Sequence, residues 1–283
     1  MLSYRHAFHA GNVADILKHL VLVNTLHYAT RKDAPLFYLD THAGAGCYAL
    51  NGDMARKTGE AAAGILALDF TALTKGLAPE SADALNRYQQ AVTPFLAGQL
   101  YPGSPLLAAS VLRQQDHLHL CELHPADFAI LQSNTGPDRR ITCEQTDGYQ
   151  RAPALLPPVQ KRAVVLIDPS YERDDDYRLV VKLAAEIHRR MASAQVLLWY
   201  PVVRRHAVEY MITSLVHKQP RDLWRFELGI RPDTDGQGMT GSGMLVTNPP
   251  WTLPGQLERC LPRLQLQLQE TDGYWRVERL TGE

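Results

Sequence analysis

The sequence predicts an α/β fold in which helices cover both faces of a mostly parallel sheet. Short, nearly continuous apolar runs recur along the 283 residues, and such runs are typical of strands buried on both faces. Helical periodicity fills most of the intervals between them, which favours a doubly wound sheet. The hydrophobic fraction of 45% and the charged fraction of 21% are ordinary for a globular chain and exclude a fibre, a coiled coil and long disorder.

Seven of these runs are predicted strands, and most end at an acidic residue, Gly or Pro. In chain order they are residues 36–40, 118–122, 141–144, 163–168, 195–200, 223–230 and 243–248. The loop between the last two is rich in Gly and Asp and has no helical period, so these two strands are expected to be antiparallel neighbours. A parallel sheet that ends in such a hairpin is the Rossmann-like, seven-stranded architecture of S-adenosylmethionine-dependent methyltransferases.

Helices are predicted between the strands. Val13, Ile16, Leu17, Leu20 and Val21 fall on one helical face, with Asn12 as the N-cap, and residues 125–133, 177–191 and 204–217 also show helical patterns. From residue 40 to residue 118 the sequence is Ala/Leu-rich and helical, for example at 60–69 and 81–95, with no strand pattern. A crossover needs far less chain, so we expect a main domain of residues 1–50 and 101–283 and an inserted helical subdomain of residues 51–100. The tail, 264–283, alternates weakly and suggests no chemistry.

Charge and cysteine usage narrow the class of protein further. Lys+Arg 29 against Asp+Glu 30 gives a net charge of -1, so any nucleic-acid site must be a local patch. The four cysteines form no CxxC pair, and the histidines lack a metalloenzyme spacing, so no metal is expected. No signal peptide is evident, and no apolar run approaches the ~18 residues of a membrane helix. We therefore expect a soluble cytoplasmic protein.

The loop after the first strand is a candidate cofactor site. Gly44 and Gly46 let the backbone turn tightly and approach a ligand at the carboxyl edge of the sheet. With Ala49 they also fit a dinucleotide fingerprint, but the acid at the required distance, Asp69, lies in a helical pattern. Glu122, which ends the second strand, can instead accept both hydroxyls of an adenosine ribose. An ordinary Gly-rich turn remains an alternative for this motif.

Asp147 and Gly148 follow the third strand. An Asp in this position can accept from the amino group of a nucleoside's adenine. The same four letters, TDGY, recur at 271–274 without a strand–helix context, so a plain Asp-Gly turn explains the motif equally well.

The fourth strand ends in Asp168-Pro169-Ser170-Tyr171, the candidate catalytic motif. An aromatic amino nitrogen is a poor nucleophile because its lone pair is delocalised into the ring. The Asp168 carboxylate and the Pro169 carbonyl can accept both N–H bonds and aim the lone pair, and Tyr171 offers a face for stacking. A strand-ending turn is the structural alternative.

A second motif, Asn248-Pro249-Pro250-Trp251, matches the Asp/Asn-Pro-Pro-aromatic pattern more closely in spelling. It follows the last, antiparallel strand, whereas the fourth strand lies beside the first at the switch point where ligands bind. Topology therefore favours Asp168, and we expect Asn248 to Trp251 to shape the rim of the base pocket or to cap the strand.

These motifs, together with residues 1–11, 101–105 and 198–203, resemble the bacterial 23S ribosomal RNA adenine-N6 methyltransferase family of the RlmJ type. The resemblance runs from Met1 to about Trp251. It implies a class I methyltransferase in which His19, His42, Ser104, Glu122, Asp147 and Gly148 hold S-adenosylmethionine, joining Gly44, Gly46 and Asp168 as predicted cofactor contacts. It also implies that Asp168 is catalytic and that Tyr4, His6 and Lys18 close over the cofactor and the target adenosine. Ser170 departs from the family, which has a second Pro there.

The predicted function is S-adenosylmethionine-dependent methylation of the N6 amino group of an adenine in 23S ribosomal RNA, free or in an early assembly intermediate. Methylation of adenine in DNA uses the same chemistry and is one alternative. A non-catalytic nucleotide- or RNA-binding protein, in which Ser170 marks lost activity, is an alternative from a different class.

Overall fold

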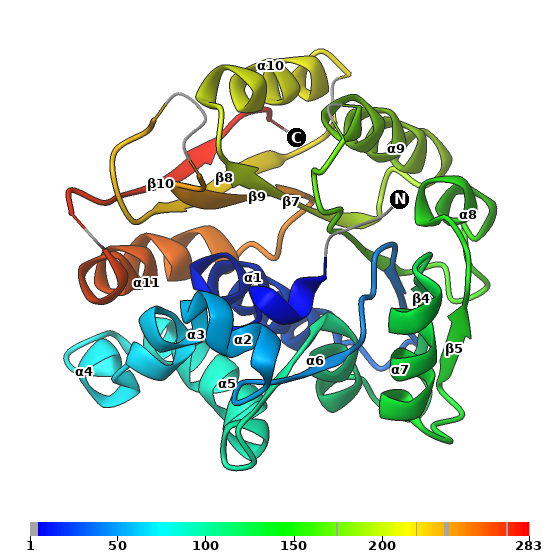
Figure 1. The fold of residues 1–283 in the computed structure, drawn as a ribbon. Coiled ribbons are helices and arrows are strands. Elements are labelled where there is room, and N and C mark those ends of the chain that lie inside the picture. The colour runs from blue at the N-terminus through cyan, green and yellow to red at the C-terminus, as the bar shows by residue number, and fades with distance from the viewer. Residues whose placement is uncertain (1–4, 174, 219, 235–237, 270, 283) are drawn as a thin grey trace.

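The computed structural model describes residues 5–173, 175–218, 220–234, 238–269 and 271–282 (Figure 1). Its main sheet has eight strands in the order β10-β8-β9-β7-β6-β1-β4-β5. They are β1 (Phe37–Asp40), β4 (His117–Cys121), β5 (Ile141–Glu144), β6 (Ala163–Ile167), β7 (Gln195–Val202), β8 (Leu223–Gly229), β9 (Gly241–Thr247) and β10 (Tyr274–Arg279). The seven predicted strands are confirmed, and β10 is an additional one.

The central strand is β1, and its position determines where a ligand can bind. It pairs in parallel with β4 on one side and with β6 on the other, and all four of its residues are buried. After β1 the chain forms β4 and β5 on one side of β1, and it then crosses over to form β6 and β7 on the other side. The reversal in the direction of strand addition creates a topological switch point beside β1. In open α/β sheets, crevices outside the carboxyl ends of the strands at such a point bind ligands.

The sheet ends in the antiparallel arrangement that the sequence predicts. β9 lies between β7 and β8 and is antiparallel to both. β10 then adds an antiparallel edge to β8, with Tyr274 opposite Gly229. A Cβ atom at Gly229 would lie 2.1 Å from the Tyr274 ring, so glycine is what admits the tyrosine there.

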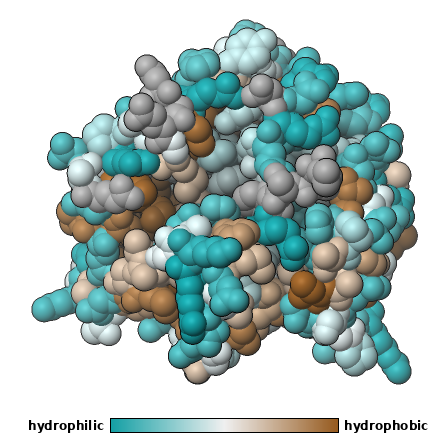
Figure 2. Space-filling model, in the orientation of Figure 1, coloured by the Kyte–Doolittle hydropathy of each residue, from teal (hydrophilic) through white to brown (hydrophobic). Residues whose placement is uncertain are grey.

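Helices pack on both faces, and the apolar side chains form two buried clusters (Figure 1). One face carries α1 (Val13–Ala29), α6 (Ser104–Val111), α7 (Pro125–Thr135) and α11 (Leu253–Leu268); the other carries α8 (Gly148–Ala154), α9 (Asp176–Arg190) and α10 (Arg205–Val216). The predicted cap of α1 is confirmed, because the Asn12 side chain accepts from the Asp15 N–H. In the space-filling view, hydrophilic residues cover most of the visible face and hydrophobic ones are scattered (Figure 2). None of the helices described has the length and apolar character to cross a membrane.

The long interval after β1 contains more than helices. Two short strands, β2 (Cys47–Ala49) and β3 (Leu100–Pro102), pair with each other and were not predicted. Between them lie α2 (Asp53–Thr58), α3 (Glu60–Ala63), a 3₁₀ turn at Ile65–Ala67, α4 (Phe70–Thr74) and α5 (Pro79–Leu96). The helix expected over 60–69 is interrupted at Gly64, where a Cβ atom would lie 2.1 Å from the carbonyl oxygen of Gly11. The close passage of the N-terminal chain therefore breaks the helix.

The alternation of Leu and Gln in the tail is helical, not extended. Leu257, Leu261, Leu264 and Leu268 recur at helical spacing and are buried, whereas Leu266 is 67% exposed. The tail, residues 264–283, thus contains the last five residues of α11, and then β10.

Candidate active site

A cavity of about 670 Å³ opens at the carboxyl ends of β1, β4, β6 and β7. It brings together most of the residues that the sequence singled out. Those that line it are His6, Lys18, His19, His42, Gly44, Ser104, Glu122, Asp147, Gly148, Asp168, Pro169 and Tyr171. Gly46 does not line it: this glycine faces α7, and a Cβ atom there would lie 3.0 Å from Leu131 Cδ1. Tyr4 lies outside the described residues.

Glu122 lines the cavity, and backbone N–H groups fix its carboxylate. Oε2 accepts the N–H of Gly44 at 2.8 Å, and Oε1 accepts the N–H of His124 at 2.6 Å. Burial raises the pKa of Glu122, and the two backbone donors oppose that rise. Each carboxylate oxygen carries more than one acceptor site, so the group can still accept from a ligand.

The loops after β1 and β5 meet, and both line the cavity. At Gly148 a Cβ atom would lie 1.9 Å from the Thr41 carbonyl oxygen, so only glycine allows this approach. The side chain of Asp147 caps α8 by accepting the N–H of Tyr149 at 2.8 Å. Burial lowers the pKa of His42 to about 3, so its imidazole is neutral. The ring centroid of His42 lies 4.8 Å from that of Tyr149, edge to face.

Ser104, the first residue of α6, and His19, on α1, also line the cavity, and both side chains are buried. Ser104 Oγ donates to Asp40 Oδ2 at 2.6 Å. His19 Nδ1 lies 2.8 Å from the Tyr101 hydroxyl, whereas His19 Nε2 is a buried nitrogen with no hydrogen-bond partner among the described residues. Burial lowers the pKa of His19 to about 3, which keeps this ring neutral. His19 therefore has a ring nitrogen left for a ligand.

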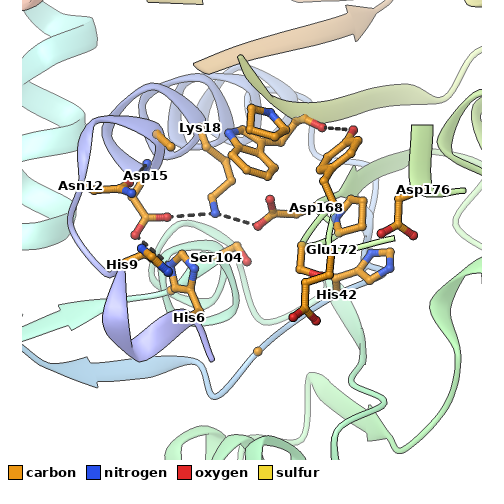
Figure 3. A pocket seen from close by; sticks show the side chains of 18 of the residues that line it. His6, His9, Asn12, Asp15, Lys18, His42, Ser104, Asp168, Glu172 and Asp176 are labelled. Atoms are coloured by element: carbon orange, nitrogen blue, oxygen red, sulfur yellow. Dashed lines mark hydrogen bonds and ion pairs between the residues drawn. The ribbon is translucent and has the colours of Figure 1, made fainter. Parts of the chain in front are cut away.

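Lys18 connects two carboxylates at the centre of the cavity (Figure 3). Its Nζ lies 2.9 Å from Asp15 Oδ1 and donates to Asp168 Oδ2 at 2.6 Å. Burial would lower the pKa of Lys18, but the two carboxylates outweigh it and the pKa is raised. Burial raises the pKa of Asp168 to about 6, although Lys18 pulls it down. At neutral pH the ammonium thus faces an ionised Asp168.

The backbone after Pro169 is sharply turned and anchored. Tyr171 has a φ of 55°, in the left-handed region, and its hydroxyl donates to the Trp199 carbonyl oxygen at 2.7 Å. The Tyr171 ring centroid lies 4.7 Å from that of Tyr177 and 5.7 Å from that of Trp199. These contacts hold the Asp168–Tyr171 loop against β7.

Sequence reasoning missed several carboxylates that line the cavity, and Asp15 and Glu60 are the two that bind the N-terminal segment. Asp15 is fully buried; its Oδ2 lies 2.9 Å from His6 Nε2 and accepts the Gly11 N–H at 2.8 Å. One available signal was that Asp15 precedes Lys18 by one helical turn. Glu60 gave no such signal, because its partners are His9 and Asn12, far away in the chain.

The competing motif at Asn248 lies at the opposite edge of the sheet, so of the two roles expected for it, shaping the rim of the base pocket is wrong and capping a strand is confirmed. β9 runs antiparallel to β7, and Asn248, just after its end, therefore meets the start of β7. Its amide donates to the carbonyl oxygens of Ala192 and Ala194, each at 2.8 Å. The motif closes the turn into β7, and Trp251 is 79% exposed.

Within the described parts of the chain, no group of three or more His, Cys, Asp or Glu side chains could hold a metal ion. His119 Nε2 instead lies 2.9 Å from Glu144 Oε2, and His117 stacks on Phe37.

A cavity at the switch point of a parallel sheet with an antiparallel last hairpin, lined by an acid after β4 and an Asp-Pro motif after β6, defines a methyltransferase of the Rossmann-like class. The family described as Ribosomal RNA large subunit methyltransferase D, RlmJ, matches residues 33–281. The chain belongs to this family.

Individual relatives are similar over all or nearly all of their length. The Ribosomal RNA large subunit methyltransferase J of Haemophilus influenzae is 44% identical over 289 residues and covers 100% of both chains. The protein of that name from Escherichia coli is 46% identical over 275 residues, covering 95% of this chain and 94% of its own. A crystal structure of a Legionella pneumophila protein is 33% identical, superposes with a TM-score of 0.85 and covers 96% of this chain and 98% of its own.

Proposed function

We propose that this protein transfers a methyl group from S-adenosylmethionine to the N6 amino group of an adenine in 23S ribosomal RNA. The observation that carries the proposal is the position of Asp168, at the carboxyl end of β6 beside β1 and within the cavity. The names of the relatives, which are methyltransferases of the large ribosomal subunit RNA, support RNA as the substrate in preference to DNA. An intact, anchored Asp168–Tyr171 loop argues against loss of activity through Ser170.

The residues present fit S-adenosylmethionine. Glu122 offers a fixed carboxylate for ribose hydroxyls, and Asp147 lines the same cavity and can serve the adenine. The neutral His19 has a buried Nε2 that makes no hydrogen bond within the described residues. His42, Gly44, Ser104 and Gly148 complete the proposed set of contacts, whereas Gly46 acts through the shape of the loop. When bound, the cofactor supplies an electrophilic methyl group.

Asp168, Pro169 and Tyr171 are the proposed catalytic residues. Lys18 binds Oδ2 of Asp168, so we assign Oδ1 and the Pro169 carbonyl oxygen as acceptors for the two amino hydrogens of the adenine. Holding both hydrogens localises the nitrogen lone pair and orients it, which is catalysis by positioning and preorganised hydrogen bonds. The Tyr171 ring, fixed by its hydroxyl, supplies the stacking face.

His6, Lys18 and Tyr4 are the proposed substrate contacts. His6 and Lys18 both bind Asp15 at the cavity wall (Figure 3). An adenine must leave its stack to enter such a cavity. We therefore assign the substrate to RNA that is free or in an early assembly intermediate, and place the reaction in the cytoplasm.

The test is transfer of labelled methyl from S-adenosylmethionine to 23S ribosomal RNA from a host lacking the gene, with DNA from the same host in parallel. We expect label in N6-methyladenine of the RNA only. Asp168→Ala should reduce the rate by about 10²–10⁴-fold. Asn248→Ala, the same motif at the opposite edge, should leave it nearly unchanged. Label in DNA, in neither polymer, or an equal loss in both variants would overturn the proposal.

A further inference from the structure

We propose that Glu60, on the inserted helices, is a positioning residue for the target-adenosine site. It clamps the N-terminal segment, residues 5–12, against the cavity wall. Only the part of the proposal that concerns the rate of methyl transfer rests on the proposed function. The docking of the N-terminal segment by Glu60 can be measured without turnover.

Glu60 grips the N-terminal segment with both carboxylate oxygens. His9 Nδ1 donates to Oε1 at 2.8 Å, and Asn12 Nδ2 donates to Oε2 at 2.9 Å. Glu60 also lines the cavity. The hydrogen bond to Glu60 raises the pKa of His9, as an ion pair between the two would require. One side chain of the insertion thereby holds two separate points of the segment.

The backbone of the insertion reinforces this grip. Ile65 N–H donates to the Gly11 carbonyl oxygen at 2.8 Å, and Thr58 Oγ1 donates to the Phe8 carbonyl oxygen. The absence of a side chain at Gly64 is what allows the two backbones to approach so closely. The insertion and the N-terminal segment therefore form one packed unit at the cavity mouth.

A continuous series of hydrogen bonds and ion pairs leads from Glu60 to Asp168. Asn12, held by Glu60, accepts the Asp15 N–H at 3.0 Å through its other amide atom. The Asp15 carboxylate then contacts His6 and Lys18, and Lys18 contacts Asp168 (Figure 3). Loss of the clamp should thus loosen His6 and Lys18 together, while Glu122, with its own backbone donors, should not respond.

The experiment compares Glu60→Ala and Glu60→Gln in the full-length protein with the wild type. Glu60→Ala should lower kcat/KM for 23S ribosomal RNA about tenfold, because two hydrogen bonds to the segment are lost. The affinity for S-adenosylmethionine, measured by calorimetry, should change less than about twofold. Glu60→Gln should restore most of the activity at neutral pH, because its amide can accept from Asn12 and donate to a neutral His9. A residue that only stabilises the fold would not give this split or this rescue.

Amide hydrogen exchange tests the docking of the N-terminal segment without any substrate. In Glu60→Ala, the amides of Gly11 and Asn12 should exchange about tenfold faster, because their protection depends on the segment staying docked. The matched control is Glu80→Ala, which removes an exposed carboxylate at the start of α5 in the same insertion and should alter neither measurement.

Unchanged exchange in Glu60→Ala would overturn the clamp, as would equal losses of cofactor affinity and RNA activity. If the wild type transfers no methyl to RNA, the proposed function fails, and the exchange measurement still decides the clamp.

Discussion

At the scale of single residues, the protonation of Asp168 should control the rate in acid. Asp168 can accept an amino hydrogen only as a carboxylate, and burial raises its pKa to about 6. The single-turnover rate should therefore fall as the pH drops below about 6. Because Lys18 lowers the pKa of Asp168, Lys18→Met should move the acid limb of the profile to higher pH. A limb at the same pH in both proteins would mean that Asp168 is not the titrating group.

Ser170 is the residue at which the chain departs from its family, and we expect the departure to be mild. A Pro at 170 would restrict ψ of Pro169 and hence the direction of its carbonyl. The loop is also held downstream, since Tyr171 is fixed to the Trp199 carbonyl oxygen. Ser170→Pro should raise the single-turnover rate modestly, and stability by about 0.4–1 kcal/mol if the backbone accepts Pro. Lost activity together with a lower melting temperature would show that the Pro169 carbonyl is placed differently.

The candidate site could be predicted from the sequence only where a strand end carries it. Asp168 and Glu122 follow buried strands, and the carboxyl ends of parallel strands meet at one edge. Asp15 and Glu60 could not be predicted in this way. Their importance comes from contacts between separate segments, such as Asn12 with Glu60 and Lys18 with Asp168, which local pattern does not encode.

At the scale of elements, removal of the first eight residues should separate activity from stability. The deletion removes Arg5, which pairs with Asp127 at 2.9 Å, and His6, which contacts Asp15. It leaves α1 with its Asn12 cap and leaves the sheet intact. We expect methyl transfer to be lost while the melting temperature stays nearly unchanged. Full activity of the truncated protein would show that the N-terminal segment plays no part in turnover.

The helices and strands that could be predicted from the sequence are those whose apolar residues follow one clear pattern. Strands buried on both faces, such as β6 and β9, are continuous apolar runs and were found. β10 is a largely exposed edge strand rich in charge, so it lacks that pattern. In residues 264–268 the alternation of Leu and Gln is compatible with both a strand and a helix. The segment is helical because its buried leucines belong to α11, which packs against α5. β2 and β3 are too short for any periodicity.

At the scale of the whole molecule, the insertion and the main domain share one core. Tyr88 and Val92 of α5 are fully buried in the same cluster as Leu17 and Leu20 of α1. We therefore propose that the main domain, residues 1–50 and 101–283, and the inserted helical subdomain, residues 51–100, fold together as a single unit.

Glu227 on β8 connects β7, β8 and α10 through a network of buried hydrogen bonds and ion pairs. Its side chain is fully buried; its Oε2 accepts from Tyr200 of β7 at 2.7 Å, from Arg205 of α10 at 3.0 Å and from Arg225 at 2.8 Å. Burial would raise the pKa of Glu227, but the arginines outweigh it and the pKa is lowered. The stability that this shift contributes is present above the unfolded-state pKa and lost as the pH falls through the lower, folded-state value.

Glu227→Gln should therefore destabilise the protein by about 3 kcal/mol at neutral pH, because the buried Arg225 and the partly exposed Arg205 lose a shared counter-charge. Glu209 and Asp233, which still pair with these arginines, keep the loss at the lower end of what breaking a buried ion pair costs. The difference in unfolding free energy from the wild type should begin to shrink as the pH falls below the ordinary pKa of a glutamate, where the unfolded state binds a proton. It should vanish only below the lower folded-state pKa, where the folded wild-type carboxyl is protonated too. Denaturant unfolding of both proteins across pH measures this.

Glu186→Gln is the control: its ion pairs with Arg189 and Arg190 lie on the surface of α9, where such pairs contribute little. Equal unfolding curves for Glu227→Gln and Glu186→Gln would mean that the buried network does not stabilise the fold. Methyl transfer well below the melting temperature should be retained in both variants, since neither Glu227 nor Glu186 lines the cavity.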